Sequence, residues 1–123
     1  MIDFDVSEAF ELPTYKDEHV RHLDLKSLNE FWQGCDPEHG GMRNGCYVFG
    51  IRTKNITPWY VGKTWKGLKK ETFNPYQQTK INQFINDHGT PVVIFVFKKS
   101  KKHESAYSKE VIRSLERFLF KQQ

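Results

Sequence analysis

A chain of 123 residues, with 37% hydrophobic and 28% charged residues, has the size and composition of one globular domain with a real core. The acidic N-terminus excludes a secretory signal, and the longest apolar run (Val92–Phe97) is too short to span a membrane. Two cysteines cannot make a disulfide framework. A cytoplasmic protein is therefore expected. Residues 1–40 carry ten acidic and three basic side chains (−7), whereas residues 41–123 carry five acidic and sixteen basic ones (+11), which favours a polyanionic partner for the second part.

The N-terminal third is predicted to hold little regular structure. Residues 1–22 mix acidic residues with a proline and show little periodicity, which is typical of a loop or a loosely held arm with a short extended piece at most. Residues 24–33 place leucines and a tryptophan at helical spacing before Gly34, which predicts a short amphipathic helix. Residues 34–45 are rich in Gly, Asp, Pro and Asn and indicate a loop.

Two short strands are predicted next. Residues 46–52 (CYVFGIR) are β-branched and aromatic, and residues 59–62 (WYVG) have the same character. The polar stretch 53–58 between them is short enough for an antiparallel hairpin. Pro58 stands just before the second strand, where a proline is tolerated.

The remaining chain alternates helix, strand and helix. A helix is predicted over residues 75–88, because Asn74 can cap its first turn, a proline takes its first position and Gly89 suits a left-handed stop. The apolar residues 92–97 predict a buried central strand. Residues 104–120 have one apolar side and predict a last helix. The expected fold is therefore α+β, a small three-stranded antiparallel sheet flanked by helices.

The hairpin carries the most specific motif. Gly45, Cys46 and Tyr47 open its first strand, and Tyr60, Val61 and Gly62 end its second. These tripeptides resemble the two that name the GIY-YIG nuclease family, with a cysteine in place of the usual aliphatic residue. The resemblance covers about residues 43–123, which would form the nuclease domain. Residues 1–42 match nothing in that family and would add an acidic arm and a short helix to the same globular unit.

The resemblance implies a metal-dependent endonuclease, a hydrolase of DNA or RNA phosphodiester bonds. Tyr47 would be the base, acting through a metal-associated water, because an unperturbed phenol with a pKa near 10 needs nearby cations to act at neutral pH. Tyr60 would position the water or the phosphate. Nucleic-acid contacts are expected from the residues around the end of the second strand: Gly62, whose backbone would let the substrate approach closely, Lys63, Thr64, Lys66 and Lys69.

Glu116 is the expected metal ligand. The stretch 115–119 resembles the family's last helix, in which an acidic residue stands among apolar ones. At about 100° per residue, Glu116 lies roughly 40° beyond Ile112 and borders the apolar side of its helix. One hard carboxylate with waters suits a single Mg²⁺ or Mn²⁺ ion. The alternative is a boundary glutamate that reaches solvent or pairs with Arg113.

One departure from the family leaves other functions open. The family carries an arginine on the helix after the second tripeptide, but no arginine lies between Arg52 and Arg113, and Lys70 is the nearest substitute. The chain could therefore be a catalytically weak or inactive nucleic-acid binding module. A third reading is a protein-interaction domain, in which the acidic segment 1–40 is the contact surface or a lid over the basic part.

Two further points concern partners and metals. The sequence shows no separate DNA-binding domain, which suggests either modest specificity or a partner, another chain or a second copy, that supplies it. A zinc site would draw on Cys35, His39 and Cys46 with His19 or His22, but their spacings match no standard ligand pattern.

Overall fold

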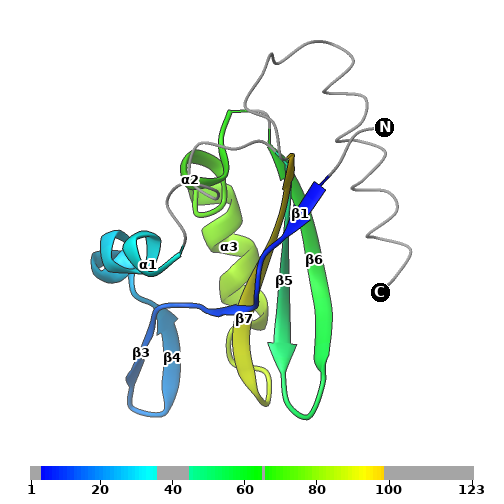
Figure 1. Cartoon of the computed structure of the whole chain (residues 1–123). Helices are drawn as coiled ribbons and strands as arrows, with labels where there is room; N and C mark the ends of the chain where they lie inside the picture. The colour runs from blue at the N-terminus through cyan, green and yellow to red at the C-terminus, as the bar shows by residue number, and fades with distance from the viewer. Residues whose placement is uncertain (1–3, 36–44, 65, 99–123) are drawn as a thin grey trace.

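The computed structural model describes residues 4–35, 45–64 and 66–98, and the helix predicted over 104–120 lies outside them. An antiparallel sheet follows the path β1-β7-β5-β6, with β2 pairing a further stretch of β7, and β3 and β4 form a separate two-stranded hairpin (Figure 1). The strands are β1 (Phe4–Val6), β2 (Phe10–Glu11), β3 (Thr14–Asp17), β4 (Val20–Leu23), β5 (Gly45–Arg52), β6 (Ile56–Thr64) and β7 (Thr90–Lys98). The α+β class and an antiparallel sheet are confirmed, but the sheet is four strands across, not three.

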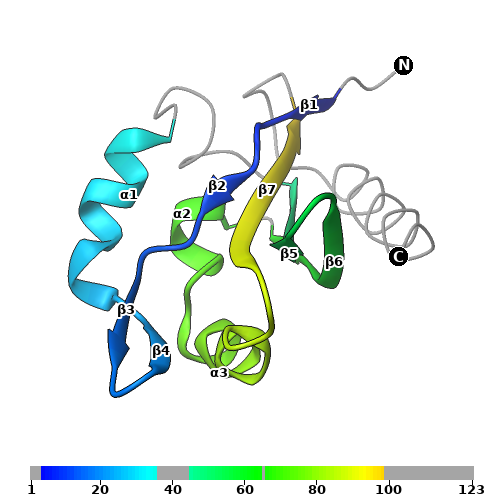
Figure 2. The same cartoon turned by 90° about the horizontal axis from the view of Figure 1, so that it is seen from below.

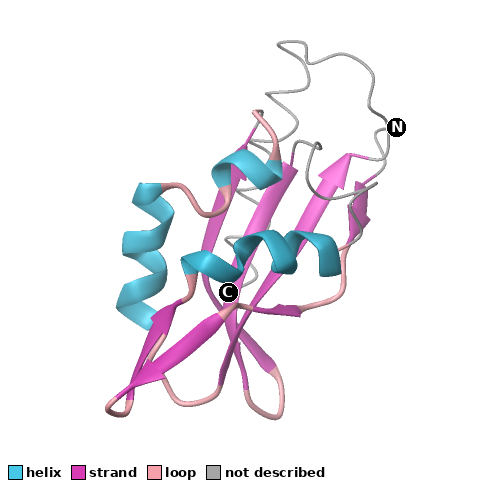
Figure 3. Cartoon of the chain, turned by 90° about the vertical axis from the view of Figure 1, so that its left-hand side faces the viewer, coloured by secondary structure: helices cyan, strands magenta, loops and turns pink. Residues whose placement is uncertain are grey.

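The described helices gather on one face of this sheet (Figures 2 and 3). They are α1 (Leu28–Gly34), which follows a 3₁₀ turn, α2 (Leu68–Glu71) and α3 (Pro75–Phe84). Ring contacts join the two layers, since Trp32 of α1 stacks on Phe95 of β7 at 5.4 Å and Phe73 lies 6.3 Å from Phe49 of β5. None of the described helices is both long and apolar enough to cross a membrane.

The predicted hairpin and central strand are confirmed with longer bounds. β5 lies between β6 and β7, and β7 is an interior strand, which accounts for its continuous apolar run. β6 begins at Ile56, so the connection is the short stretch 53–55. Pro58 therefore lies inside the strand rather than before it.

Helix α3 begins where its cap predicts and ends early. The Asn74 side chain accepts a hydrogen bond from the backbone N–H of Gln77 at 2.9 Å, and a proline fills the first helical position. The last helical residue is Phe84, so Gly89 (φ +122°) turns the chain into β7 instead of ending the helix. Helix α2 was not predicted, because it is four residues long and carries no apolar periodicity.

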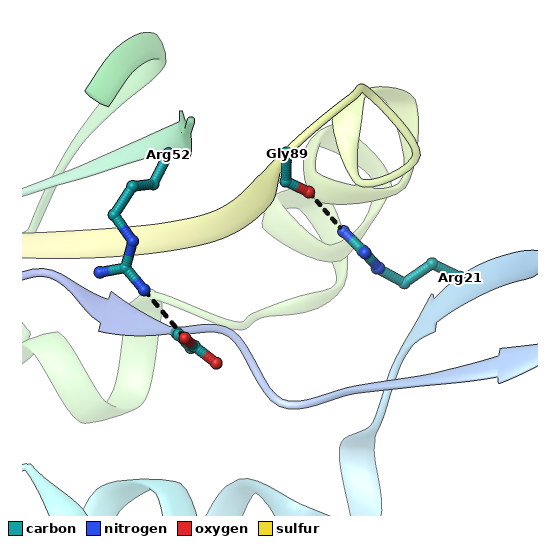
Figure 4. Close-up of polar contacts among 4 residues, drawn as sticks. Arg21, Arg52 and Gly89 are labelled. Carbon is teal, nitrogen blue, oxygen red and sulfur yellow. Dashed lines mark hydrogen bonds and ion pairs between the residues drawn. The ribbon is translucent and has the colours of Figure 1, made fainter. Parts of the chain in front are cut away.

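The N-terminal segment is part of the domain, and the expectation of a loosely held arm was wrong for residues 4–22. Strands β1 and β2 pair with β7, and Leu12 and Leu23 are 5% and 8% exposed in the core. Two arginines tie this segment to the body (Figure 4): Arg52 of β5 forms an ion pair of 2.8 Å with Glu11, and Arg21 donates to the Gly89 carbonyl at 3.0 Å.

Asn86 adds a second tie between the hairpin and the end of α3. The Arg21 backbone N–H donates to the Asn86 side-chain oxygen at 2.7 Å, and the Asn86 amide donates back to the Arg21 carbonyl at 3.1 Å. The side chain thus satisfies both backbone groups of one strand residue. Because core residues and these bonds lie in the same segment, deleting residues 1–22 would disrupt the fold. Such a deletion therefore cannot show whether the acidic segment acts as a lid over the basic part.

The turn of the β3–β4 hairpin holds two residues in an unfavourable conformation. Glu18 (φ 49°) and His19 (φ 80°) are the two turn residues, and positive φ at both is the geometry that favours Asn-Gly. Replacing them together, Glu18→Asn with His19→Gly, should raise the free energy of unfolding by about 1 kcal/mol. Urea denaturation measures this gain. Lys54→Gly in the β5–β6 turn is the control, because φ is not positive there and glycine should destabilise. If the two changes had the same effect on the free energy of unfolding, positive φ at Glu18 and His19 would not be a source of strain.

Candidate functional site

The hairpin brings the two predicted tyrosines to one face of the sheet. Tyr47 pairs with Gly62 and Phe49 pairs with Tyr60 across β5 and β6. Because paired residues share a face and alternate residues return to it, Tyr47, Phe49 and Tyr60 all lie on the helix-covered side. The Phe49 ring packs against both phenols, with its centroid 5.5 Å from that of Tyr47 and 6.1 Å from that of Tyr60. The tripeptide motif thus places two phenol rings against one shared aromatic ring.

Gly62 leaves room for the Tyr47 ring. A Cβ atom at position 62 would overlap ring carbons Cε2 and Cζ of Tyr47 and lie 2.5 Å from its hydroxyl oxygen. The ring therefore crosses directly over the Gly62 backbone. Close approach was expected here, but the group that approaches is the tyrosine of the first tripeptide, not a substrate.

Gly45 meets a similar constraint from the other neighbouring strand. A Cβ atom at position 45 would overlap the Val96 carbonyl oxygen and lie 2.7 Å from the Phe97 Cα, both in the backbone of β7. The two glycines of the paired tripeptides are thus both explained by packing inside the sheet.

A β-bulge in β6 redirects one aromatic side chain. Phe49 pairs with Tyr60 but Gly50 pairs with Pro58, so Trp59 is an extra residue opposite the β5 ladder. Trp59 and Tyr60 consequently both stack on Phe49, at 5.4 Å and 6.1 Å. Proline has no N–H for the ladder, and such a position is common at bulges.

Trp59 then anchors α3 against the edge strand. Its ring stacks on Phe84 with centroids 4.5 Å apart. Among the described residues, its buried indole nitrogen has no hydrogen-bond partner, a cost of about 1–3 kcal/mol that the ring contacts must offset. The bulge therefore fixes where α3 lies relative to Tyr60.

The two tyrosines differ in access to solvent. Tyr47 is 1% exposed and belongs to the hydrophobic core, whereas Tyr60 is only partly buried. Within the described structure, Tyr60 is therefore the one of the two phenols that solvent can reach.

Lys80 is a site residue that the sequence interpretation missed. Its ammonium nitrogen lies 6.0 Å from the ring centroid of Tyr60 and 5.5 Å from that of Tyr76, both within cation–π range. Tyr76, Lys80 and Phe84 occur four residues apart and form one stripe of α3. Because Phe84 is an apolar residue of the predicted helix 75–88, this spacing was the available signal that Lys80 would border its packed side.

The predicted nucleic-acid contacts separate into two groups. Lys66, Lys69 and Lys70 are exposed around α2. Lys63 pairs with Cys46, so it lies on the sheet face opposite Tyr47 and Tyr60 and is not brought together with them.

Thr64 has a structural role in the turn before α2. The side chain is 3% exposed, and its hydroxyl oxygen accepts from the Lys66 N–H at 3.0 Å while the hydroxyl donates to the Gly67 carbonyl at 3.4 Å. These bonds shape the turn that carries the exposed lysines. Thr64 therefore supports the basic surface from within.

The expected metal ligand and the zinc alternative have different outcomes. Glu116 lies outside the described residues, so its position relative to the tyrosines stays a prediction.

Among the residues described, no group of three or more His, Cys, Asp and Glu side chains could hold a metal. Burial, and secondarily Glu8, raises the pKa of the Cys35 thiol to about 11, and a protonated thiol is a poor zinc ligand.

The comparisons with known proteins identified no relative of this chain. The chain was compared with protein-family models, with curated proteins and with solved structures, and none of these comparisons found a match. The resemblance to GIY-YIG nucleases therefore rests on the sequence alone, on the paired tripeptides and the stretch 115–119.

Proposed function

We propose that the chain is a metal-dependent nuclease that hydrolyses DNA phosphodiester bonds at the Tyr60 face. The observation that carries the proposal is the placement of Tyr47 and Tyr60 on one side of the hairpin, both packed against Phe49, with the Tyr47 ring seated over Gly62. Two phenols held in fixed relation by a packed core are preorganised groups, which is what positioning catalysis needs.

The cationic groups of this face have a defined part in the proposal. Phosphodiester hydrolysis places negative charge on the phosphoryl oxygens, and cations near the reacting group stabilise it. Lys80 brings an ammonium beside Tyr60, in addition to the exposed Lys70 that was expected to replace the family arginine. Lys66 and Lys69 would contact neighbouring phosphates.

Glu116 would complete the site as the ligand of one Mg²⁺ or Mn²⁺ ion. Carboxylate and phenol oxygens are hard donors, which fits either ion. When bound, the cation would neutralise charge on the phosphate during attack by water. Tyr60 would hold the phosphate through its hydroxyl, and Tyr47 would take the proton of the attacking water.

Plasmid nicking in the presence of Mg²⁺ tests this function. Tyr47→Phe, Tyr60→Phe and Glu116→Ala should each lower the nicking rate by about 10²-fold or more, because each removes a group that acts in the reaction. Tyr15→Phe is the matched control, since Tyr15 is an exposed tyrosine on the β3–β4 hairpin and should cut at the parental rate. Equal nicking by all variants, with melting curves unchanged, would eliminate the assignment.

A second candidate, a nucleic-acid binding module that does not cleave, is favoured by the burial of Tyr47. A side chain that is 1% exposed is placed for packing, and a base must reach the reacting water. The missing arginine between Arg52 and Arg113 agrees with this candidate. Binding that weakens steeply with salt, without cleavage in Mg²⁺ or Mn²⁺, would select it over the nuclease.

A further inference from the structure

Tyr76 is an exposed aromatic side chain beside the proposed site. It stands in the first turn of α3 and is 61% exposed. Single exposed aromatics are common on protein surfaces, so exposure alone indicates little. The neighbourhood of Tyr76 is what distinguishes it from Tyr15, which is 51% exposed but stacks on His22 of the adjacent strand at 5.2 Å.

One ammonium group connects Tyr76 to the tyrosine of the motif. Lys80 places its nitrogen 5.5 Å from the Tyr76 centroid and 6.0 Å from the Tyr60 centroid. The cation is held by two ring faces, and its three N–H donors remain capable of bonding a phosphate oxygen. Tyr60 itself is fixed by stacking on Phe49. The surface thus presents, in order, a fixed phenol, a cation and an exposed ring.

The surrounding charge suits a nucleic-acid strand. Helix α2 runs into α3 through residues 72–74, and Lys66, Lys69 and Lys70 are exposed on and just before it. Glu71 is the acidic residue of α2, and its carboxylate accepts a hydrogen bond from the Asn74 side-chain amide at 3.0 Å. A basic surface with an exposed aromatic ring is the combination that binds single strands, in which lysines follow the phosphates and rings stack on bases.

We propose that Tyr76, beside Lys80, stacks on an unpaired base next to Tyr60, so that the preferred substrate is single-stranded at this point. The inference rests on the proposed function, because it assumes that the Tyr60 face takes nucleic acid. A paired base offers only its edges in the grooves, since its faces are covered by neighbouring base pairs. An unpaired base has an open face for Tyr76, and Lys80 holds the adjoining phosphate.

Fluorescence anisotropy measures this preference without requiring cleavage. The full chain is titrated, with EDTA present and salt constant, into a fluorescein-labelled oligodeoxythymidylate and into a blunt duplex of the same length. The parental protein should bind the single strand more tightly. Tyr76→Ala should weaken single-strand binding about tenfold and change duplex binding less than twofold, because one base stack is worth about 1–3 kcal/mol. Tyr76→Phe should retain the parental affinity, since the stacking ring is kept.

Tyr15→Ala is the matched control, because it removes an exposed tyrosine far along the chain from α3 and should leave both affinities unchanged. Lys80→Ala should weaken both complexes, since phosphates occur in both. Parental affinities that are equal for the two probes, or a Tyr76→Ala loss no larger than that of Tyr15→Ala, would overturn the inference and leave the nuclease proposal standing. No binding of either probe would instead reject the proposed function, and the inference with it.

Discussion

Replacing Gly62 by alanine should lower the free energy of unfolding by about 3 kcal/mol, because the new methyl group would occupy the volume of the Tyr47 ring. The ring has little room to move, since Tyr47 is 1% exposed and its neighbour Phe49 is fully buried. Either the ring must leave its rotamer or the β5–β6 hairpin must open at this pair. Urea denaturation followed by tryptophan fluorescence measures the loss.

Two further variants show whether the Tyr47 ring is the cause. Tyr47→Ala removes the ring and is costly alone, but Gly62→Ala should add almost nothing to it, which a double-mutant cycle reports as a large coupling. Gly34→Ala is the matched control, because a Cβ atom there meets no atom of the described residues within 4 Å and alanine favours the helix. If Gly62→Ala and Gly34→Ala had the same stability, the packing described for the motif would be wrong.

Truncating Phe49 to alanine should cost about 4 kcal/mol and loosen both motif tyrosines at once. The ring is 0% exposed and packs against both Tyr47 and Tyr60. It also stacks on Trp59 at 5.4 Å, so indole fluorescence should change together with stability. Because natural domains are stable by about 5–15 kcal/mol, such a loss is a large part of the total.

The control for this change keeps the position apolar. Phe49→Leu retains most of the buried area and should cost clearly less than alanine. Val6→Ala, at a position that is 68% exposed, should be close to neutral. An alanine at position 49 that costs no more than Val6→Ala would show that the Phe49 ring does not hold the two tyrosines in place.

The sequence predicted the elements that carry their own signals. Asn74 and the following proline located the start of α3, and the apolar run 92–97 identified an interior strand. Strands β1 and β2 escaped prediction because two or three residues show no periodicity. Their conformation comes from pairing with β7, a partner more than 80 residues away.

The candidate site was predictable in its motif and not in its surroundings. The paired tripeptides put Tyr47 and Tyr60 on neighbouring strands of a hairpin, and the register of that hairpin places both on one face. The bulge at Trp59 was not foreseen, because a one-residue slip leaves no mark in composition. Lys80 escaped notice for a related reason, since its place beside Tyr60 depends on how α3 packs against β6. The opposite placement of Lys63 did follow from strand alternation and was overlooked.

The place of β7 in the sheet has a consequence for synthesis of the chain. β7 is the last described strand in sequence but lies between β1 and β5, and Ser7 bonds to Phe95 across 88 residues. The β5–β6 hairpin can close locally as it emerges from the ribosome, whereas β1 and β2 have no edge to join until β7 appears. The N-terminal strands β1 and β2 must therefore stay unpaired for several seconds of translation, until β7 has been made. Chaperones can bind them during this period. Refolding of the full chain does not reproduce this delay, because β7 is present from the start.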